Sequence, residues 1–295
     1  MSNTPLGKYY ETLPTATHQT GDIWSELPTF GLIKNPYLPG IVITPACDLA
    51  NNKVETISFL PILPVNSYLY SPSFWPEIRG SLLSAADQLQ LPATFRNLFR
   101  DFSRIDTDSI NCAKDIITQT LSDRHPNPAR LRCSACLQYL IKTLSPSVTT
   151  PSHQNLSDAI GQKLFDSHLT KIVTNSYRND IHFLPCDNQD LSWSTITSHA
   201  LVLFRYPLTI PMAILDMAHS STPEEWESYI NHATMPNTAA LFNPLSRPVK
   251  GLTLRGEFLH DLLTRFTCLY TRIGSPDLTY NAIQKILKDL REKAI

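Results

Sequence analysis

The spacing of apolar residues changes three times along this 295-residue chain, and this succession strongly limits the folds that it can form. Apolar and polar residues alternate imperfectly within 21–65, as in half-buried strands. Apolar residues then recur at three- and four-residue spacing over 72–175, which is typical of amphipathic helices. Strand-like segments return over 181–215, and the rest of the chain is helical in pattern. The sequence therefore predicts two β-rich stretches separated by a long helical insertion.

Five segments carry the strand signal. Residues 40–44 form a short β-branched run between two prolines, and 200–206 is a continuous apolar run suited to a buried strand. Two asparagines in the polar turn at 49–52 favour a hairpin, because Asn tolerates positive φ angles. The predicted strands are 21–24, 40–44, 53–62, 181–185 and 200–206.

Helices are predicted on both sides of the second β-rich stretch. Thr222, Pro223 and Glu225 form a near-complete capping box for a helix at 226–232. The next helix is strongly amphipathic. The predicted helical segments are 78–89, 95–102, 110–121, 129–144, 156–169, 226–232, 254–273 and 280–293.

Pairing between the two β-rich stretches gives the simplest assembly. Isolated pieces of two or three strands rarely fold alone, so we expect one small antiparallel β-barrel in an α+β fold. The helical insertion would pack outside this barrel. The predicted organisation is 1–70 as the N-terminal half of the barrel, 71–176 as the helical insertion, 177–220 as the second half of the barrel and 221–295 as a C-terminal helical segment.

The opening stretch carries a recognisable order of motifs. Gly-Asp-Ile-Trp at 21–24 begins a strand, and Pro-Gly-Ile-Val-Ile-Thr-Pro follows at 39–45. Asn51 lies in the next turn, and Pro-Ile at 61–62 ends the following strand. This order resembles the start of the MazF/PemK-type toxin ribonucleases over 21–65. The resemblance implies an SH3-like barrel and a prokaryotic toxin–antitoxin or antiphage-defence setting.

The same resemblance implies that the ribonuclease activity is lost. The catalytic Arg of the family would fall at Leu38, and its catalytic Thr or Ser would fall at Leu63. Cleavage of RNA through the 2′-hydroxyl needs a proton-transfer group and a donor at the phosphate. Two leucines supply neither, so the resemblance favours a barrel that acts as a binding surface.

A different chemistry is suggested by Cys47 and Asp48, which follow a predicted strand. Loops at strand ends often display functional groups. Cys47 would act as a nucleophile if a histidine approached it and Asp48 oriented that histidine; the candidate bases are His18, His182 and His199. The alternative is a small buried thiol and a carboxylate that caps the turn.

A nuclease with replaced catalytic groups is the other enzymatic hypothesis. His182, Arg205 and Asp48 are its candidate residues, because each could move a proton or contact a phosphate. RNA degradation that is lost on replacing His182 and Arg205 with alanine would identify this activity.

Cys133 and Cys136 form a C-x₂-C pair, with Cys112 and His125 upstream. Four such ligands can make a tetrahedral zinc site. The pair falls inside a predicted helix, however, on a face that also carries leucines, so core packing is the preferred interpretation and we predict no metal and no cofactor. A redox role is weaker still.

Three arginines at fourfold spacing, Arg96, Arg100 and Arg104, indicate a basic face on one predicted helix. Such a stripe can contact nucleic-acid phosphates. The chain as a whole has 25 basic and 26 acidic residues and a net charge of −1. A solvated face paired with neighbouring aspartates is therefore preferred.

The chain is expected to be cytoplasmic and to offer surfaces for a protein partner. No secretory signal and no apolar run of membrane-spanning length is visible, and six cysteines are few for a disulfide scaffold. The aromatic run at 68–76 and the amphipathic C-terminal helices are surfaces that a partner could recognise. Together with the setting that the resemblance implies, these surfaces lead us to expect a non-catalytic adaptor in a prokaryotic multi-protein system.

Overall fold

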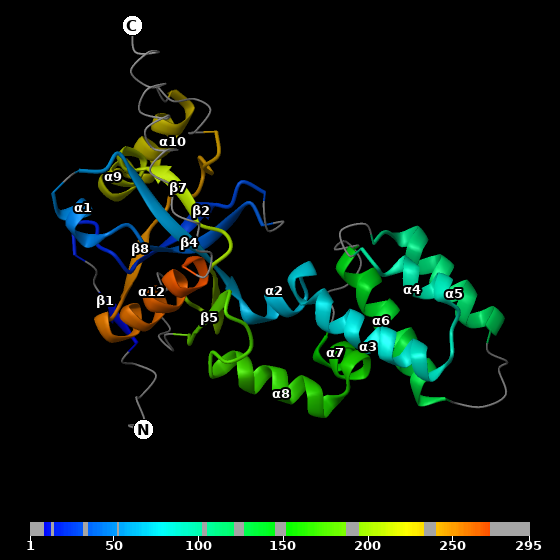
Figure 1. Cartoon of the computed structure of the whole chain (residues 1–295). Helices are drawn as coiled ribbons and strands as arrows, with labels where there is room; N and C mark the ends of the chain where they lie inside the picture. The colour runs from blue at the N-terminus through cyan, green and yellow to red at the C-terminus, as the bar shows by residue number, and fades with distance from the viewer. Residues whose placement is uncertain are drawn as a thin grey trace, which may run out of the picture.

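A curved antiparallel sheet forms the body of the molecule, and a group of helices extends from it as an arm (Figure 1). The computed structural model describes residues 9–12, 15–31, 35–51, 53–101, 105–120, 127–144, 152–186, 195–232 and 240–271. The strands are β1 (Tyr10–Thr12), β2 (Asp22–Pro28), β3 (Tyr37–Val42), β4 (Thr56–Pro64), β5 (Ile181–Leu184), β6 (Ala200–Leu203), β7 (Leu208–Pro211) and β8 (Lys250–Leu254).

Strand β4 joins the two β-rich stretches of the sequence. The strand order is β1-β8-β2-β3-β4-β6-β5, and β7 also pairs with β4. Along β4, Ile57 faces Ile210 of β7, and Ile62 faces Val202 of β6. Both pairings are antiparallel, so the expectation that the two stretches share one antiparallel sheet is confirmed.

The sheet formed by the described strands is open, and the closed barrel expected from the sequence is not observed there. Its path ends at β1 on one side and at β5 on the other. The nine residues of β4 explain this difference, because they offer one edge to two partners in succession, first β7 and then β6. The sheet therefore branches at β4 and ends at β5, and its last strand does not pair with β1.

The helical arm is built around one apolar cluster that also includes residues of the sheet. Large buried side chains such as Phe74, Phe95 and Tyr139 pack inside it, and Leu38 and Leu63 from the sheet belong to the same apolar cluster. The arm is therefore packed against the sheet. Its helices are α2 (Val65–Leu69), η2 (Pro72–Phe74), α3 (Trp75–Gln88), α4 (Ala93–Leu98), α5 (Thr107–Thr120), α6 (Pro128–Leu144), α7 (His153–Ile160) and α8 (Gln162–Val173).

Two helices replace the single one predicted at 156–169. Gly161 separates α7 from α8 and has a φ of +86°, a conformation that non-glycine residues rarely adopt. Ser152 begins α7 with a capping box to Asn155. The apolar spacing continues across the break, which is why the sequence pattern did not reveal it.

Helices also cover the body of the molecule. One apolar cluster joins the sheet to α9 (Met212–Ser220) and α10 (Pro223–His232), and another joins it to α12 (Gly256–Tyr270). The predicted capping box of α10 is confirmed: Thr222 Oγ1 accepts from the Glu225 amide, and Glu225 Oε2 accepts from the Thr222 amide.

The C-terminal part is not purely helical as expected. Lys250–Leu254 forms β8, which is buried throughout and pairs with both β1 and β2. The predicted helix at 280–293 lies outside the described residues. Within the described part of the chain, no helix has the length and apolarity needed to cross a membrane.

Candidate functional site

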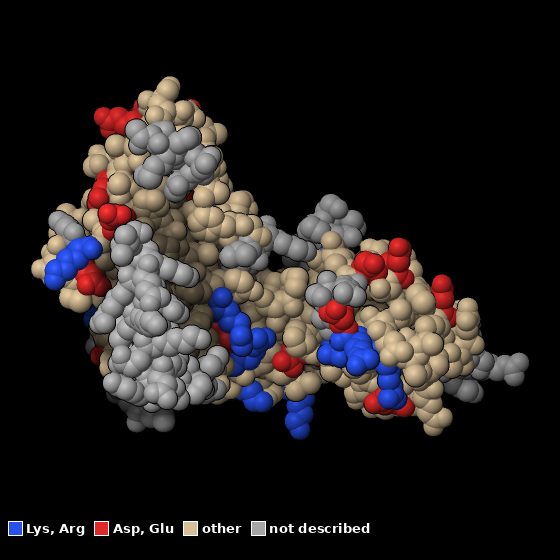
Figure 2. All heavy atoms as spheres, turned by 45° about the horizontal axis from the view of Figure 1, so that its top comes forward, with Lys and Arg blue, Asp and Glu red and all other residues tan. Residues whose placement is uncertain are grey.

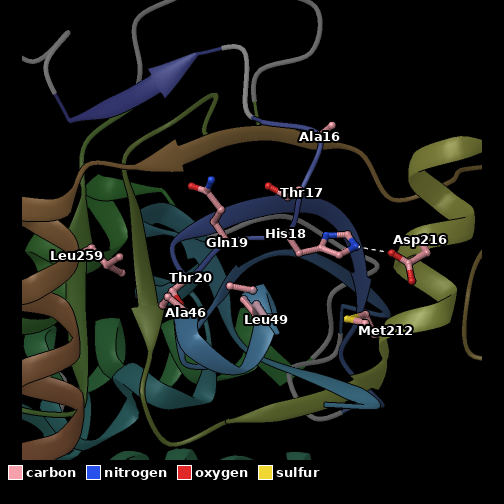
Figure 3. A pocket seen from close by; sticks show the side chains of 11 residues that line it. Ala16, Thr17, His18, Gln19, Thr20, Ala46, Leu49, Met212, Asp216 and Leu259 are labelled. Atoms are coloured by element: carbon pink, nitrogen blue, oxygen red, sulfur yellow. Dashed lines mark hydrogen bonds and ion pairs between the residues drawn. The ribbon is translucent and has the colours of Figure 1, made fainter. Parts of the chain in front are cut away.

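A large cavity in the body lies between the loop 15–20 and three helices, α1 (Ala46–Ala50), α9 and α12 (Figure 3). Its volume is about 1010 Å³, which is in the range of cavities that bind organic ligands. Leucine and methionine side chains give it an apolar floor, and polar groups come mainly from the loop. The lining residues are Ala16, Thr17, His18, Gln19, Thr20, Ala46, Leu49, Ala50, Met212, Asp216 and Leu259.

His18 and Asp216 form the one ionisable pair among these lining residues. His18 Nε2 lies 2.8 Å from Asp216 Oδ1, and the two side chains point toward one another across the cavity wall in Figure 3. The His18 side chain is 10% exposed and that of Asp216 is 57% exposed. His18 Nδ1 is buried and has no hydrogen-bond partner among the described residues. The pairing therefore fixes the ring orientation and leaves part of the carboxylate open to solvent.

A buried ion pair holds the loop that carries His18. Lys250 Nζ lies 3.3 Å from Asp22 Oδ2 and donates to the carbonyl oxygens of Thr15 and Thr17 at 2.5 and 2.9 Å. Asp22 in turn accepts from the Gln19 amide at 2.8 Å. Both ends of the loop are thus tied to the sheet, and the cavity wall is preformed.

Aromatic rings surround this anchor. The His18 ring lies 5.5 Å from the Trp24 ring and 6.4 Å from that of His219. Partial burial lowers the pKa of His219, and the charges of Lys250 and His18 lower it further. At neutral pH His219 is therefore mostly uncharged, and it adds no cation beside His18.

Cys47 and Asp48 lie on α1, a short helix that replaces the expected hairpin turn. The Cys47 thiol is exposed and lies 3.6 Å from Asp48 Oδ1. Asn51 Nδ2 donates to the Cys47 carbonyl at 2.6 Å, which closes the helix end. Cys47 is thus a surface residue and not the buried thiol of the alternative interpretation; it adjoins Ala46, which lines the cavity.

The predicted histidine bases have other neighbours. His18 pairs with Asp216, and His199 Nδ1 accepts from the Cys186 amide at 3.0 Å. Within the described part of the chain, none of the three candidates makes a hydrogen bond to the Cys47 thiol.

His182 is buried in β5. Its ring stacks on Phe204 at 6.2 Å, and its Nδ1 lies 4.0 Å from Asp261 Oδ2. Burial lowers its pKa to about 4; Asp261 opposes this shift and Arg265 adds to it. His182 is therefore neutral under ordinary conditions, and it borders a small cavity of about 180 Å³.

Arg205 lies at a third place, just after β6. Its Nε is 2.5 Å from Asp180 Oδ2, and Asp180 also binds Arg178. The residues predicted to act together in catalysis are thus spread over three places: Cys47 and Asp48 lie on α1, His182 lines the cavity of about 180 Å³, and Arg205 lines another of about 210 Å³.

The arginine stripe is interrupted. Helix α4 ends at Leu98, so Arg96 and Arg100 do not share one continuous helical face. Arg96 forms an exposed ion pair with Asp87 at 2.5 Å. The neighbouring rings of Phe95 and Phe99 are fully buried in the core of the arm, with centroids 5.4 Å apart. Arg104 lies outside the described residues.

Cys133 and Cys136 are core residues of α6. Their thiols face the carbonyl oxygens of Leu82 and Ala159, at 3.9 and 3.3 Å. Burial raises the pKa values of Cys133 and Cys136 to about 11 and about 12. Among the described residues, no group of three or more His, Cys, Asp or Glu side chains is arranged to bind a metal ion. His125 lies outside them.

Sequence reasoning missed Asp216 and Lys250, the two residues that position His18. Each lies far along the chain from its partner, and no local pattern marks either residue. Comparison of the chain with protein-family models, with curated proteins and with solved structures found no match. The proposals below therefore rest on the geometry of the chain and on the resemblance in its first strands.

Proposed function

We propose that the chain is a non-catalytic binding component of a prokaryotic multi-protein system and that the cavity beneath the 15–20 loop receives a protein partner. The resemblance of 21–65 to the MazF/PemK family supports the setting. The observation that carries the proposal is a preformed cavity of about 1010 Å³ with an apolar floor and an exposed carboxylate at its edge.

The chemistry of the lining indicates what the partner would present. Leu49 and Met212 would receive an apolar side chain, because burial of apolar surface supplies most of the affinity in such sites. Asp216 would pair with a cationic or hydrogen-bond-donating group at the rim. The partner segment is therefore expected to combine an apolar anchor with a neighbouring Lys or Arg.

The arrangement of the other candidate residues favours binding over catalysis. The buried histidine and the arginine of the enzymatic hypotheses line different cavities, and the cysteine lies on the exposed surface of α1. At the family's two catalytic positions, Leu38 and Leu63 are packed in the apolar core. This supports a relative of the toxin barrel that has a binding surface but no ribonuclease activity. The proposal includes an SH3-like origin for the open sheet.

The test uses one substitution at two places. The full chain is co-expressed with the products of neighbouring genes, and complex mass is measured by light scattering after gel filtration. Ala46→Glu puts a charge into the cavity lining, whereas Ala213→Glu puts the same charge on an exposed part of α9 that does not line it. We expect Ala46→Glu alone to abolish the complex. A persistently monomeric wild-type protein, or equal binding by both variants, would overturn the proposal.

A Cys47 hydrolase is the second candidate function, because an exposed thiol on α1 adjoins the cavity that also holds His18. Thiolate attack on p-nitrophenyl acetate would release p-nitrophenolate and form an acetyl thioester, which water then hydrolyses. The test compares Cys47→Ser with the parent in a Cys112→Ser/Cys268→Ser background. Turnover that Cys47→Ser abolishes would favour this enzyme over the binding role, and equal background rates would remove it.

A further inference from the structure

A second cavity lies where the sheet meets the helical arm, and more basic than acidic side chains line it. Strands β5 and β6 approach α2 and α3 there, around a volume of about 210 Å³. Two guanidinium groups, from Arg178 and Arg205, share the single carboxylate of Asp180. Figure 2 shows Lys and Arg side chains gathered near the middle of the molecule, where body and arm join. The ionisable groups that line this cavity carry a net positive charge.

The two arginines differ in how many donors they have left. Arg178 gives Nε and Nη2 to Asp180 at 2.9 and 2.7 Å and Nη1 to the Ser73 carbonyl at 3.3 Å. Arg205 gives only Nε to Asp180, and its side chain is 64% exposed. Within the described residues, the terminal nitrogens of Arg205 make no hydrogen bond, so they can bind a ligand.

Asp180 keeps both arginines in place. Its side chain is 7% exposed, and its carbonyl accepts from the Phe204 amide at 2.9 Å. Burial alone would raise the pKa of Asp180, but its bonds to Arg178 and Arg205 lower it below the ordinary value. The carboxylate is therefore charged at neutral pH, and it fixes the guanidinium groups before any ligand arrives.

Tyr68 adds a buried donor to the same cavity. Tyr68 is 1% exposed, and the proton of its hydroxyl has no acceptor in the described structure; the Arg178 guanidinium beside the hydroxyl is itself only a donor. Burial raises the pKa of Tyr68 to about 12, so the hydroxyl stays protonated at neutral pH. The charge and hydrogen bonding of the Arg178 guanidinium oppose this shift, whereas the Asp180 carboxylate and, more weakly, the Glu77 carboxylate add to it. Glu77 accepts a hydrogen bond from Tyr177 and does not line the cavity. A buried hydroxyl whose proton has no acceptor is costly unless a ligand satisfies it.

We propose that this cavity binds a phosphate group, with Arg205 and Tyr68 as its donors and Arg178 as a fixed positive charge. A guanidinium fork matches the spacing of phosphate oxygens, and charge-assisted bonds of this kind are strong. The cavity is smaller than those that usually enclose a whole organic ligand, which suits one phosphate group. This site shares no lining residue with the large cavity beneath the 15–20 loop, so it goes beyond the proposed function.

The competing explanation is a purely structural clamp between the arm and the sheet. Arg178 and Asp180 would serve as that clamp, since Arg178 also reaches the carbonyl of Ser73 in η2. Arg205 and Tyr68 are therefore the residues to replace. Arg205→Gln leaves the Arg178–Asp180 pair intact, and Tyr68→Phe removes only a hydroxyl group whose proton has no acceptor in the described structure.

The experiment measures binding of inorganic phosphate to the full chain by calorimetry and by the shift in unfolding temperature, at ionic strength matched with NaCl. We expect wild type to be stabilised by phosphate. Arg205→Gln and Tyr68→Phe should each weaken its affinity by about tenfold or more. Lys163→Gln, which removes one exposed charge from α8, should leave the affinity unchanged.

The source of the phosphate group is resolved by parallel titrations with AMP and adenosine. Tighter binding of AMP than of inorganic phosphate, without binding of adenosine, would identify a nucleotide end; equal affinities would identify free phosphate. No stabilisation of wild type beyond NaCl, or unchanged phosphate affinity in Arg205→Gln, would overturn the proposal. Tyr68→Phe keeps the test decisive if Arg205→Gln proves unstable.

Discussion

Lys250 on β8 and Asp22 on β2 form an ion pair in which neither side chain has exposed surface. The pair lies beneath the loop that carries His18, and Lys250 also binds two carbonyl oxygens of that loop. Thr253 Oγ1 donates to Asp22 Oδ1 at 2.8 Å. One buried contact therefore joins two strands and shapes the wall of the large cavity.

Replacing Lys250 with methionine should destabilise the protein strongly. Methionine fills similar space but leaves Asp22 as a buried, uncompensated charge, and loss of one partner of a buried pair costs about 3–5 kcal/mol. The free energy of unfolding in urea measures this loss. Lys250→Met/Asp22→Leu removes both charges and should recover most of the stability. A single variant within about 0.5 kcal/mol of wild type would contradict the assignment.

Thiol reactivity separates the core cysteines from the surface ones. In a Cys186→Ser background at pH 8, a disulfide reagent should label Cys47, Cys112 and Cys268, whose side chains are exposed. Cys133 and Cys136 should react only in denaturant, because burial raises their pKa values to about 11 and about 12. EDTA should leave the unfolding midpoint unchanged. Labelling of five thiols in the native protein would count against this core, and an EDTA-dependent midpoint would indicate a zinc site.

Local sequence patterns predicted the features that depend on neighbouring residues, such as helix caps and single strands. The hydroxyl of Thr222 and the carboxylate of Glu225 lie three residues apart and cap α10 as expected. The β-branched and apolar runs predicted β3, β4 and β6, although β3 begins earlier than expected. That the two β-rich stretches share one sheet followed from the need of small strand groups for partners; the β4–β6 pairing itself was not predicted.

The candidate site could not be derived in the same way. His18 was a candidate base, but Asp216 and Lys250 come from elements that only tertiary packing brings to it. β8 was missed because five residues leading into a helix carry too weak an alternation to stand out. Leu38 and Leu63, in contrast, are buried in the apolar core, as expected for apolar side chains.

Acidification should destabilise the protein through His182. Its pKa is about 4 in the folded chain and about 6.5 when unfolded, so the unfolded state binds more protons between these values. The contribution of neutral His182 to the free energy of unfolding is complete above about pH 6.5, and about 3 kcal/mol is lost as the pH approaches 4. Urea unfolding at a series of pH values measures the slope.

Burial also lowers the pKa values of His168 and His219, so these two histidines likewise make the protein less stable as the pH falls. The variant His182→Gln is therefore needed to isolate the contribution of His182. The variant should show a shallower slope than wild type between pH 6.5 and 4.5. His260→Gln changes an exposed histidine of α12 and should keep the wild-type slope. Parallel slopes for His182→Gln and wild type would rule out the buried histidine as their cause.

Two glycine-to-alanine substitutions should act in opposite directions. At Gly40 in β3, a Cβ atom would lie 2.5 Å from a ring carbon of Phe59 and 2.8 Å from a methyl of Leu27, both buried. Such overpacking costs about 1–3 kcal/mol.

At Gly80 in α3 a Cβ atom meets nothing within 4 Å, and alanine should stabilise the helix by about 0.5–1 kcal/mol. Urea unfolding of the two variants and wild type measures both changes in the free energy of unfolding. Because β3 pairs with β4 at Gly40 and Pro61, the loss in Gly40→Ala should come with weakened amide protection along this pair. Stabilisation by Gly40→Ala would mean that β3 and β4 do not approach as closely as described.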